Sequence, residues 1–114
     1  MLASEVQSIT ENYQERVVKR REELTNRLFR SASMNPIQEE SIYIRIEELD
    51  KFDSVLFDSG ALTDRELAII QRRMNGMTLE EIGRVFLVGR ERIRQILAEC
   101  YKKISEEYNS QFVS

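Results

Sequence analysis

Residues Thr78 to Ile104 read T-L-E-E-I-G-R-V-F-L-V-G-R-E-R-I-R-Q-I-L-A-E-C-Y-K-K-I, a pattern that predicts two helices joined by a tight turn. The first helix opens with a capping box: Thr78 and Glu81 stand three residues apart, and each side chain can accept a hydrogen bond from the other's backbone N–H. Its inward face has apolar residues at spacings of three and four, namely Ile82, Val85 and Phe86. Leu87 to Gly89 is too short to be anything but a turn.

The second predicted helix is amphipathic, and Gly89 is an acceptable N-cap for it. Its apolar stripe consists of Ile93, Ile96, Leu97, Cys100 and Ile104. At 100° per residue, Glu91, Gln95 and Ala98 lie opposite this stripe. Two such helices with a short turn are typical of a helix-turn-helix, whose second helix enters the DNA major groove by its N-terminal end.

Side chains near the start of the second helix suit contacts with bases and phosphates. Arginine can bond to guanine O6 and N7, glutamine to adenine, and glutamate can accept from cytosine N4. We therefore predict as DNA-binding residues Arg84, Arg90, Glu91, Arg92, Arg94 and Gln95. The alternative is an ordinary charged, solvent-exposed helix, which the turn length and the concentration of arginine make the weaker interpretation.

A longer stretch, Leu62 to Ile96, reads L-T-D-R-E-L-A-I-I-Q-R-R-M-N-G-M-T-L-E-E-I-G-R-V-F-L-V-G-R-E-R-I-R-Q-I and resembles region 4 of bacterial RNA polymerase sigma factors. R-E-R-I-R-Q-I is its most specific part. The resemblance implies that the second helix reads a promoter −35 element and that an apolar groove holds the flap of the polymerase β subunit. The groove candidates are Leu67, Ile70, Met74 and Phe86, although a plain core is the favoured interpretation for most of them. Gly89 replaces the usual Ser or Thr, and Glu99 stands where a basic residue is common.

Residues 4 to about 30 predict one long helix, because apolar residues recur at spacings of three, four or seven without Gly or Pro. Such a narrow stripe needs a partner, which is a second copy, another segment of the chain or another protein. We expect a separate unit over residues 1–33, able to form a homodimer, and a tri-helical core that folds without it. The basic residues of its second half are interpreted as solvated rather than as a phosphate-binding arm.

Residues 34–60 are predicted to form a linker and an acidic helix. Ser31 to Pro36 is a break, because Pro36 cannot continue a helix and Asn35 before it avoids the helical region. Residues 37 to 58 alternate like a strand at first, but their helical spacing and the lack of a pairing strand favour a helix. Gly60 is its expected terminator. The predicted fold is therefore all-α, ending in a helix-turn-helix domain over residues 61–114.

The composition argues against a catalytic, metal-binding or cofactor-binding site. The chain has no His, one Cys and no glycine-rich phosphate loop, so we expect no enzyme, metal or cofactor. No apolar run approaches a membrane span and no secretory signal is visible, which favours a cytoplasmic location. The net charge of −3 suggests weak DNA binding alone, because neutralising phosphates supplies much of the affinity.

Three functions remain open. The first is a small transcription regulator of the region 4 type that binds promoter DNA and acts with RNA polymerase. Its small size and modular build are compatible with a phage or prophage origin. No stretch resembles the module that melts promoter DNA, so a complete sigma factor is not expected. The second is a mimic that occupies polymerase or a sigma factor with little DNA contact. The third is an oligomeric DNA-binding assembly or packaging protein.

Overall fold

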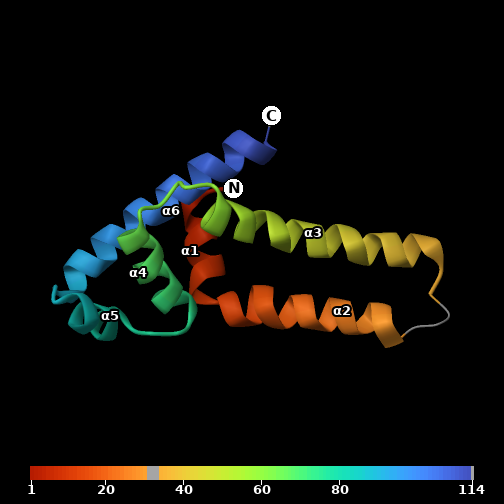
Figure 1. Cartoon of the computed structure of the whole chain (residues 1–114), viewed down its shortest axis with the longest axis horizontal. Coiled ribbons are helices and arrows are strands. Elements are labelled where there is room, and N and C mark those ends of the chain that lie inside the picture. The colour runs from red at the N-terminus through yellow and green to blue at the C-terminus, as the bar shows by residue number, and fades with distance from the viewer. Residues whose placement is uncertain (31–33, 114) are drawn as a thin grey trace.

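The computed structural model describes residues 1–30 and 34–113. The elements are α1 (Ala3–Glu11), a π-helical segment η1 (Gln14–Lys19), α2 (Arg20–Arg30), α3 (Pro36–Asp58), α4 (Asp64–Met74), α5 (Leu79–Phe86) and α6 (Arg90–Phe112) (Figure 1). No strand occurs in these residues, which confirms the all-α prediction. Residues 31–33 of the predicted break lie outside the described residues. None of the helices in the described ranges is long and apolar enough to cross a membrane.

The core is one cluster to which every element except α2 contributes. The long helix α6 runs through it, with α1, α4, α5 and the C-terminal end of α3 packed around it (Figure 1). The fully buried residues of the core cluster include Val6, Val55, Ile70, Ile82 and Ile104. Burying a side chain of this size stabilises the fold by about 1.5–3 kcal/mol. The core therefore joins residues from both ends of the chain.

The single helix predicted over residues 4 to 30 is wrong. The chain changes direction at Asn12, whose backbone has φ −119° and ψ 25° and whose side-chain amide donates to the Ser8 carbonyl at 2.9 Å. An asparagine side chain that bonds to nearby backbone competes with helix continuation. Before this turn α1 crosses α6, and after it α2 runs antiparallel to α3 (Figure 1). One residue of interruption leaves the apolar spacing almost unchanged, so the periodicity did not reveal it.

The predicted boundary after residue 33 does not separate two packing units. Val6, Tyr13 and Val17 are buried in the same cluster as the helix-turn-helix residues. Near the chain start, the Met1 carbonyl accepts from Ser105 Oγ at 2.6 Å and from Asn109 Nδ2 at 3.0 Å. The stripe on the N-terminal segment thus finds its partner within the chain.

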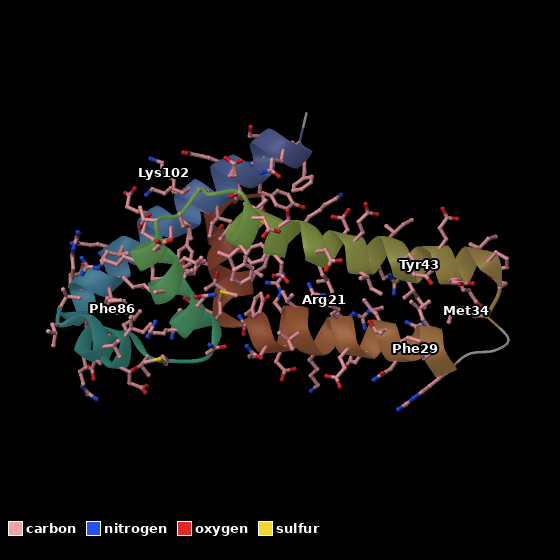
Figure 2. All side chains as sticks on the ribbon, viewed as in Figure 1. Arg21, Phe29, Met34, Tyr43, Phe86 and Lys102 are labelled. Atoms are coloured by element: carbon pink, nitrogen blue, oxygen red, sulfur yellow. The ribbon has the colours of Figure 1, made fainter. Side chains whose placement is uncertain are left out.

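Helices α2 and α3 form a hairpin that projects from the core, away from α5 and the start of α6 (Figure 1). At its base, Asp53 accepts from the Tyr13 hydroxyl at 2.6 Å and from Arg21 at 2.7 Å, and Arg21 also forms an ion pair with Asp50 at 2.9 Å. Arg21 points between the two helices, whereas Phe29, 85% exposed, lies near the tip (Figure 2). Arg21 therefore stabilises the pairing of α2 with α3. Because α3 is helical over Pro36–Asp58, the prediction of a helix over residues 37 to 58 is confirmed.

Local signals around the helix-turn-helix are confirmed in detail. Thr63 Oγ1 accepts from Glu66 N, and Thr78 Oγ1 from Glu81 N, both at 3.2 Å. Each glutamate accepts in return from the threonine's backbone N–H. The inward face of α5 is narrower than predicted, because Val85 is 51% exposed.

The turn between α5 and α6 contains a leucine in the left-handed region. Leu87 has φ 58° and is 91% exposed, so its side chain gains little from burial. A non-glycine residue in this conformation costs about 1–2 kcal/mol. We expect Leu87→Gly to raise the free energy of unfolding by up to about 1 kcal/mol, measured by urea denaturation. A loss of stability would show that the Leu87 side chain makes a contact that outweighs the backbone strain.

Candidate nucleic-acid interface

The first two turns of α6 present their polar side chains to solvent. Arg90, Glu91, Arg92, Arg94 and Gln95 are all exposed, whereas Ile93 and Leu97 between them are buried in the core. The apolar stripe therefore anchors the helix and leaves the predicted DNA-binding side chains on the opposite surface. Ala98 is exposed on that surface too, and its small side chain leaves space there.

Helix α5 fixes the position of this surface through a close backbone contact. Gly83 is buried, and a Cβ on it would lie 2.6 Å from the Val88 carbonyl oxygen. The turn residue Val88 also donates its N–H to the Gly83 carbonyl at 3.0 Å. Only glycine allows this approach, so Gly83 sets how near the turn lies to α5. Arg84 follows it and is exposed, 3.9 Å from Glu80.

Glu91 and Arg94 form a tight ion pair on the exposed surface. Arg94 Nε donates to Glu91 Oε1 at 3.0 Å and to Oε2 at 2.9 Å, and Arg94 Nη2 donates to Oε1 as well. The hydrogen bonds from Arg94 lower the pKa of the Glu91 carboxyl, and the same bonds raise the pKa of Arg94. Both groups are therefore charged near neutral pH. The hydrogen bonds between them use donors of Arg94 and acceptors of Glu91 that DNA would otherwise meet.

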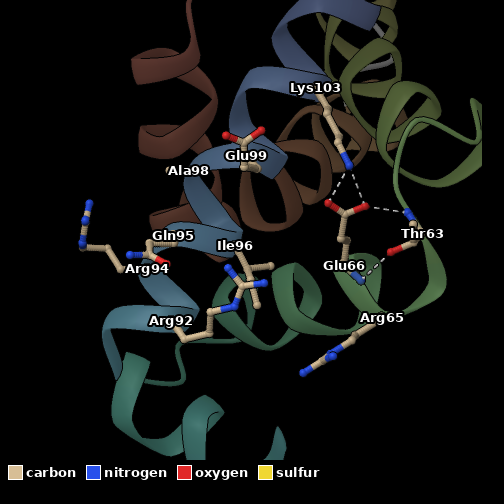
Figure 3. Close-up of a pocket in the computed structure, with 10 residues that line it drawn as sticks. All are labelled: Thr63, Arg65, Glu66, Arg92, Arg94, Gln95, Ile96, Ala98, Glu99 and Lys103. Carbon is tan, nitrogen blue, oxygen red and sulfur yellow. Dashed lines mark hydrogen bonds and ion pairs between the residues drawn. The ribbon is translucent and has the colours of Figure 1, made fainter. Parts of the chain in front are cut away.

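A groove lies between α6 and the N-terminal end of α4. Arg65 on α4 and Arg92 on α6 both line it, and Arg92 points toward α4 while Arg94 points the other way (Figure 3). Neither Arg65 nor Arg92 forms an ion pair with a described residue. On the other side of α6, Arg90 lies beside the N-terminal end of α5. Exposed cations thus flank both sides of the helix.

The floor of this groove is held by a fixed charge pair. Lys103 Nζ donates to Glu66 at 2.8 and 3.0 Å (Figure 3). Partial burial alone would raise the pKa of Glu66, but the hydrogen bonds from Lys103 and Thr63 lower it overall. Lys103 is therefore engaged within the domain, which leaves the free positive charge of the groove to Arg65 and Arg92.

Two other arginines near the domain surface turn inward. Arg72 donates to the Ala68 carbonyl at 3.0 Å and lies 5.1 Å over the Phe86 ring. Arg73 donates to the Met77 carbonyl at 2.9 Å and lies 3.9 Å from Glu11 on α1. These two residues stabilise the domain, and their sequence positions alone do not distinguish them from Arg65.

The residues proposed for a polymerase groove are not equally accessible. Ile70 and Met74 are buried in the core. Leu67 and Phe86 are half-buried and lie at its edge. Sequence reasoning also missed Arg65 as a member of the cationic surface, since its closeness to Arg92 depends on how α4 packs on α6.

Comparison with known proteins places this surface in a family. Residues 60–106 match the family model for sigma-70, region 4. Over 72 residues the chain is 35% identical to the RNA polymerase sigma factor RpoH of Rhizobium radiobacter, covering 60% of this chain and 24% of that protein. Over 48 residues it is 50% identical to the RNA polymerase sigma factor SigA of Listeria monocytogenes, covering 38% of this chain and 13% of that protein. No solved structure matches the chain significantly.

These matches span about a quarter or less of the relatives' own lengths. The family model covers the part of the chain that holds α4, α5 and most of α6, and it begins after the α2–α3 hairpin. The hairpin and α1 therefore lie outside the matched family segment. Residues 60–106 of this chain form a sigma-70 region 4 domain.

Proposed function

We propose that the chain is a sequence-specific DNA-binding transcription regulator whose α6 enters the major groove by its N-terminal end. The observation that carries the proposal is the exposed polar surface of Arg90 to Gln95 on the second helix of a region 4 helix-turn-helix. An exposed arginine and glutamine on successive residues of such a helix supply the donors that distinguish guanine and adenine.

The placement of the cations supports this mode of binding. Arg65 and Arg92 lie on one side of α6, and Arg90 lies on the other side, next to α5. The phosphates of the two DNA strands line the two edges of a major groove, so cations on both sides of an inserted helix can each meet one strand. In this arrangement Arg94 and Gln95 read bases, while Arg65, Arg84, Arg90 and Arg92 contact phosphates.

Arg94→Ala is expected to weaken binding to the preferred site by about 1–3 kcal/mol and to relax the preference at one base position. The reason is that a bidentate contact to a base edge is lost while the exposed position leaves the fold intact. Selection from a random double-stranded pool, followed by affinity measurement on the selected site, checks it. An unchanged sequence preference would exclude Arg94 from base reading.

Arg84→Ala is the matched control for this measurement. Arg84 is exposed, as Arg94 is, but it lies on α5, so we assign it to phosphate. Its loss is expected to weaken all sequences alike and to lower the salt slope by about one unit, since one fewer counterion is released. If only Arg94→Ala changes the sequence preference, Arg94 reads a base and Arg84 contributes through its charge alone.

The relatives are RNA polymerase sigma factors, and we propose that this chain also acts with RNA polymerase. Within the predicted groove set, Leu67 and Phe86 are the members that a partner can reach, because Ile70 and Met74 are buried. The net charge of −3 supports a reader that needs a second protein to hold it on DNA.

Selection from a random double-stranded DNA pool, with and without core RNA polymerase, tests both parts. One motif enriched by the protein alone would establish an autonomous regulator, and a motif enriched only with polymerase would establish a sigma-like or co-activator role. Retention of polymerase without any motif would favour the mimic. A homodimer through the N-terminal region, or a DNA-packaging assembly, would be detected by light scattering as a mass of two or more chains.

A further inference from the structure

We propose that Glu91 determines the specificity of this interface by holding Arg94 in an ion pair, so that Arg94 is released only to a base step that satisfies both side chains. The inference rests on the proposed insertion of α6 into the major groove. Its ligand is a step that places guanine O6 and N7 beside an exocyclic amino group, the N4 of cytosine or the N6 of adenine.

The geometry of the pair carries the argument. The Arg94 guanidinium donates from two nitrogen atoms to both carboxylate oxygens of Glu91. Two parallel hydrogen bonds between charged groups are stronger and more directional than a single contact. By comparison, the other arginine–glutamate pair of the helix-turn-helix, Arg84 and Glu80, has one contact at 3.9 Å. Arg84 is therefore nearly free to meet phosphate, whereas Arg94 is not.

A DNA phosphate is a poor replacement for Glu91. It offers Arg94 the same kind of anionic oxygen that Glu91 already supplies, and it leaves the Glu91 carboxylate without its donor and close to a negatively charged backbone. A buried or partly dehydrated acceptor without a donor is unfavourable. The pair should therefore oppose binding wherever the protein slides on DNA that offers only phosphate oxygens.

A suitable base step replaces both partners at once. Guanine O6 and N7 accept from Arg94, and a neighbouring cytosine or adenine amino group donates to Glu91. Thymine presents O4 and a methyl group in the major groove, so it gives Glu91 no donor. On this class of base step, Arg94 and Glu91 each replace the hydrogen bonds that they lose when the ion pair opens. On other steps at least one of them does not, and this difference is how the ion pair produces selectivity.

The test compares Glu91→Gln with Glu80→Gln, which removes the same charge from the other pair. Affinity for a random duplex and for the selected duplex is measured over a range of salt concentrations, and circular dichroism confirms the fold. Glu91→Gln is expected to tighten binding to the random duplex, to steepen its salt slope by about 0.9 as Arg94 gains a phosphate, and to lower the selected-to-random ratio about tenfold. Glu80→Gln should change the ratio by less than about twofold, because Arg84 is barely engaged.

A second comparison separates the ion pair from simple charge repulsion. In an Arg94→Ala background, Glu91→Gln should affect random-duplex binding no more than Glu80→Gln does, since no arginine is left to release. Equal effects of the two glutamine variants, in a protein that still selects one sequence, would overturn the inference alone. Failure of the wild-type protein to bind any duplex, with or without polymerase, would overturn the proposed function and this inference with it.

Discussion

Val6→Asp is expected to unfold the whole chain, the helix-turn-helix included. Val6 is 0% exposed and belongs to the same cluster as Ile82, Ile93 and Ile104. A carboxylate at this position would be buried in an apolar cluster, and an unpaired buried charge costs several kcal/mol or more. Small domains have a total stability of about 5–15 kcal/mol, so a large part of it would be lost.

Circular dichroism and thermal unfolding measure this effect directly. Leu2→Asp is the matched control, because Leu2 lies on the same segment but is 67% exposed and occupies the N-cap of α1, where aspartate is favoured. It should unfold at the wild-type temperature or slightly above. A Val6→Asp protein with unchanged helicity and melting temperature would show that α1 is dispensable, as the sequence pattern had suggested.

Gly83→Ala is expected to destabilise the domain and to weaken DNA binding together. Alanine would normally favour an exposed helix position by up to about 1 kcal/mol. Here the new Cβ would lie 2.6 Å from the backbone oxygen of Val88, which cannot move without shifting the turn. Forced overpacking of this kind costs about 1–3 kcal/mol. The same shift would change the direction in which α6 leaves the turn, and so the position of Arg90 to Gln95.

Gly89→Ala separates the contact from the general effect of changing a glycine. Gly89 has φ −76°, and nothing lies within 4 Å of a Cβ placed on it. Alanine there is a poorer N-cap than glycine, so the loss of stability should be well under that of Gly83→Ala. Urea denaturation and duplex binding of both variants provide the comparison. Equal losses would mean that the Gly83–Val88 approach does not limit the turn.

The parts of the fold that follow from neighbouring residues were predictable. The capping boxes of Thr63 with Glu66 and of Thr78 with Glu81 are local, since each bond joins residues three apart. The helix over Pro36–Asp58 was also accessible from periodicity, despite its alternating start. The stripe of α6 predicted which side chains face solvent, because the exposed and buried positions follow one helical period.

The remainder depends on contacts between distant residues. On the two sides of the turn at Asn12, α1 packs on α6 near the other end of the chain, and Arg21 of α2 bonds to Asp53 of α3, 32 positions away. The sequence alone does not show that Arg73 bonds inward to Met77 while Arg65 stays free beside Arg92. The burial of Ile70 and Met74, by contrast, agrees with the inward face that their helical spacing predicted.

Helix α6 is one unbroken rod of 23 residues, about 34 Å long, without an internal glycine or proline. Its first turns carry the proposed base-reading side chains, and its last turns touch α1 and α3. A rod of this kind has no joint at which its ends can move independently. A tilt imposed on one end by a bent or mismatched duplex must therefore appear at the other, where the C-terminal end of α3 packs at the base of the hairpin. A change in the tilt of α6 on DNA would therefore shift the contacts that its C-terminal end makes with α1 and α3.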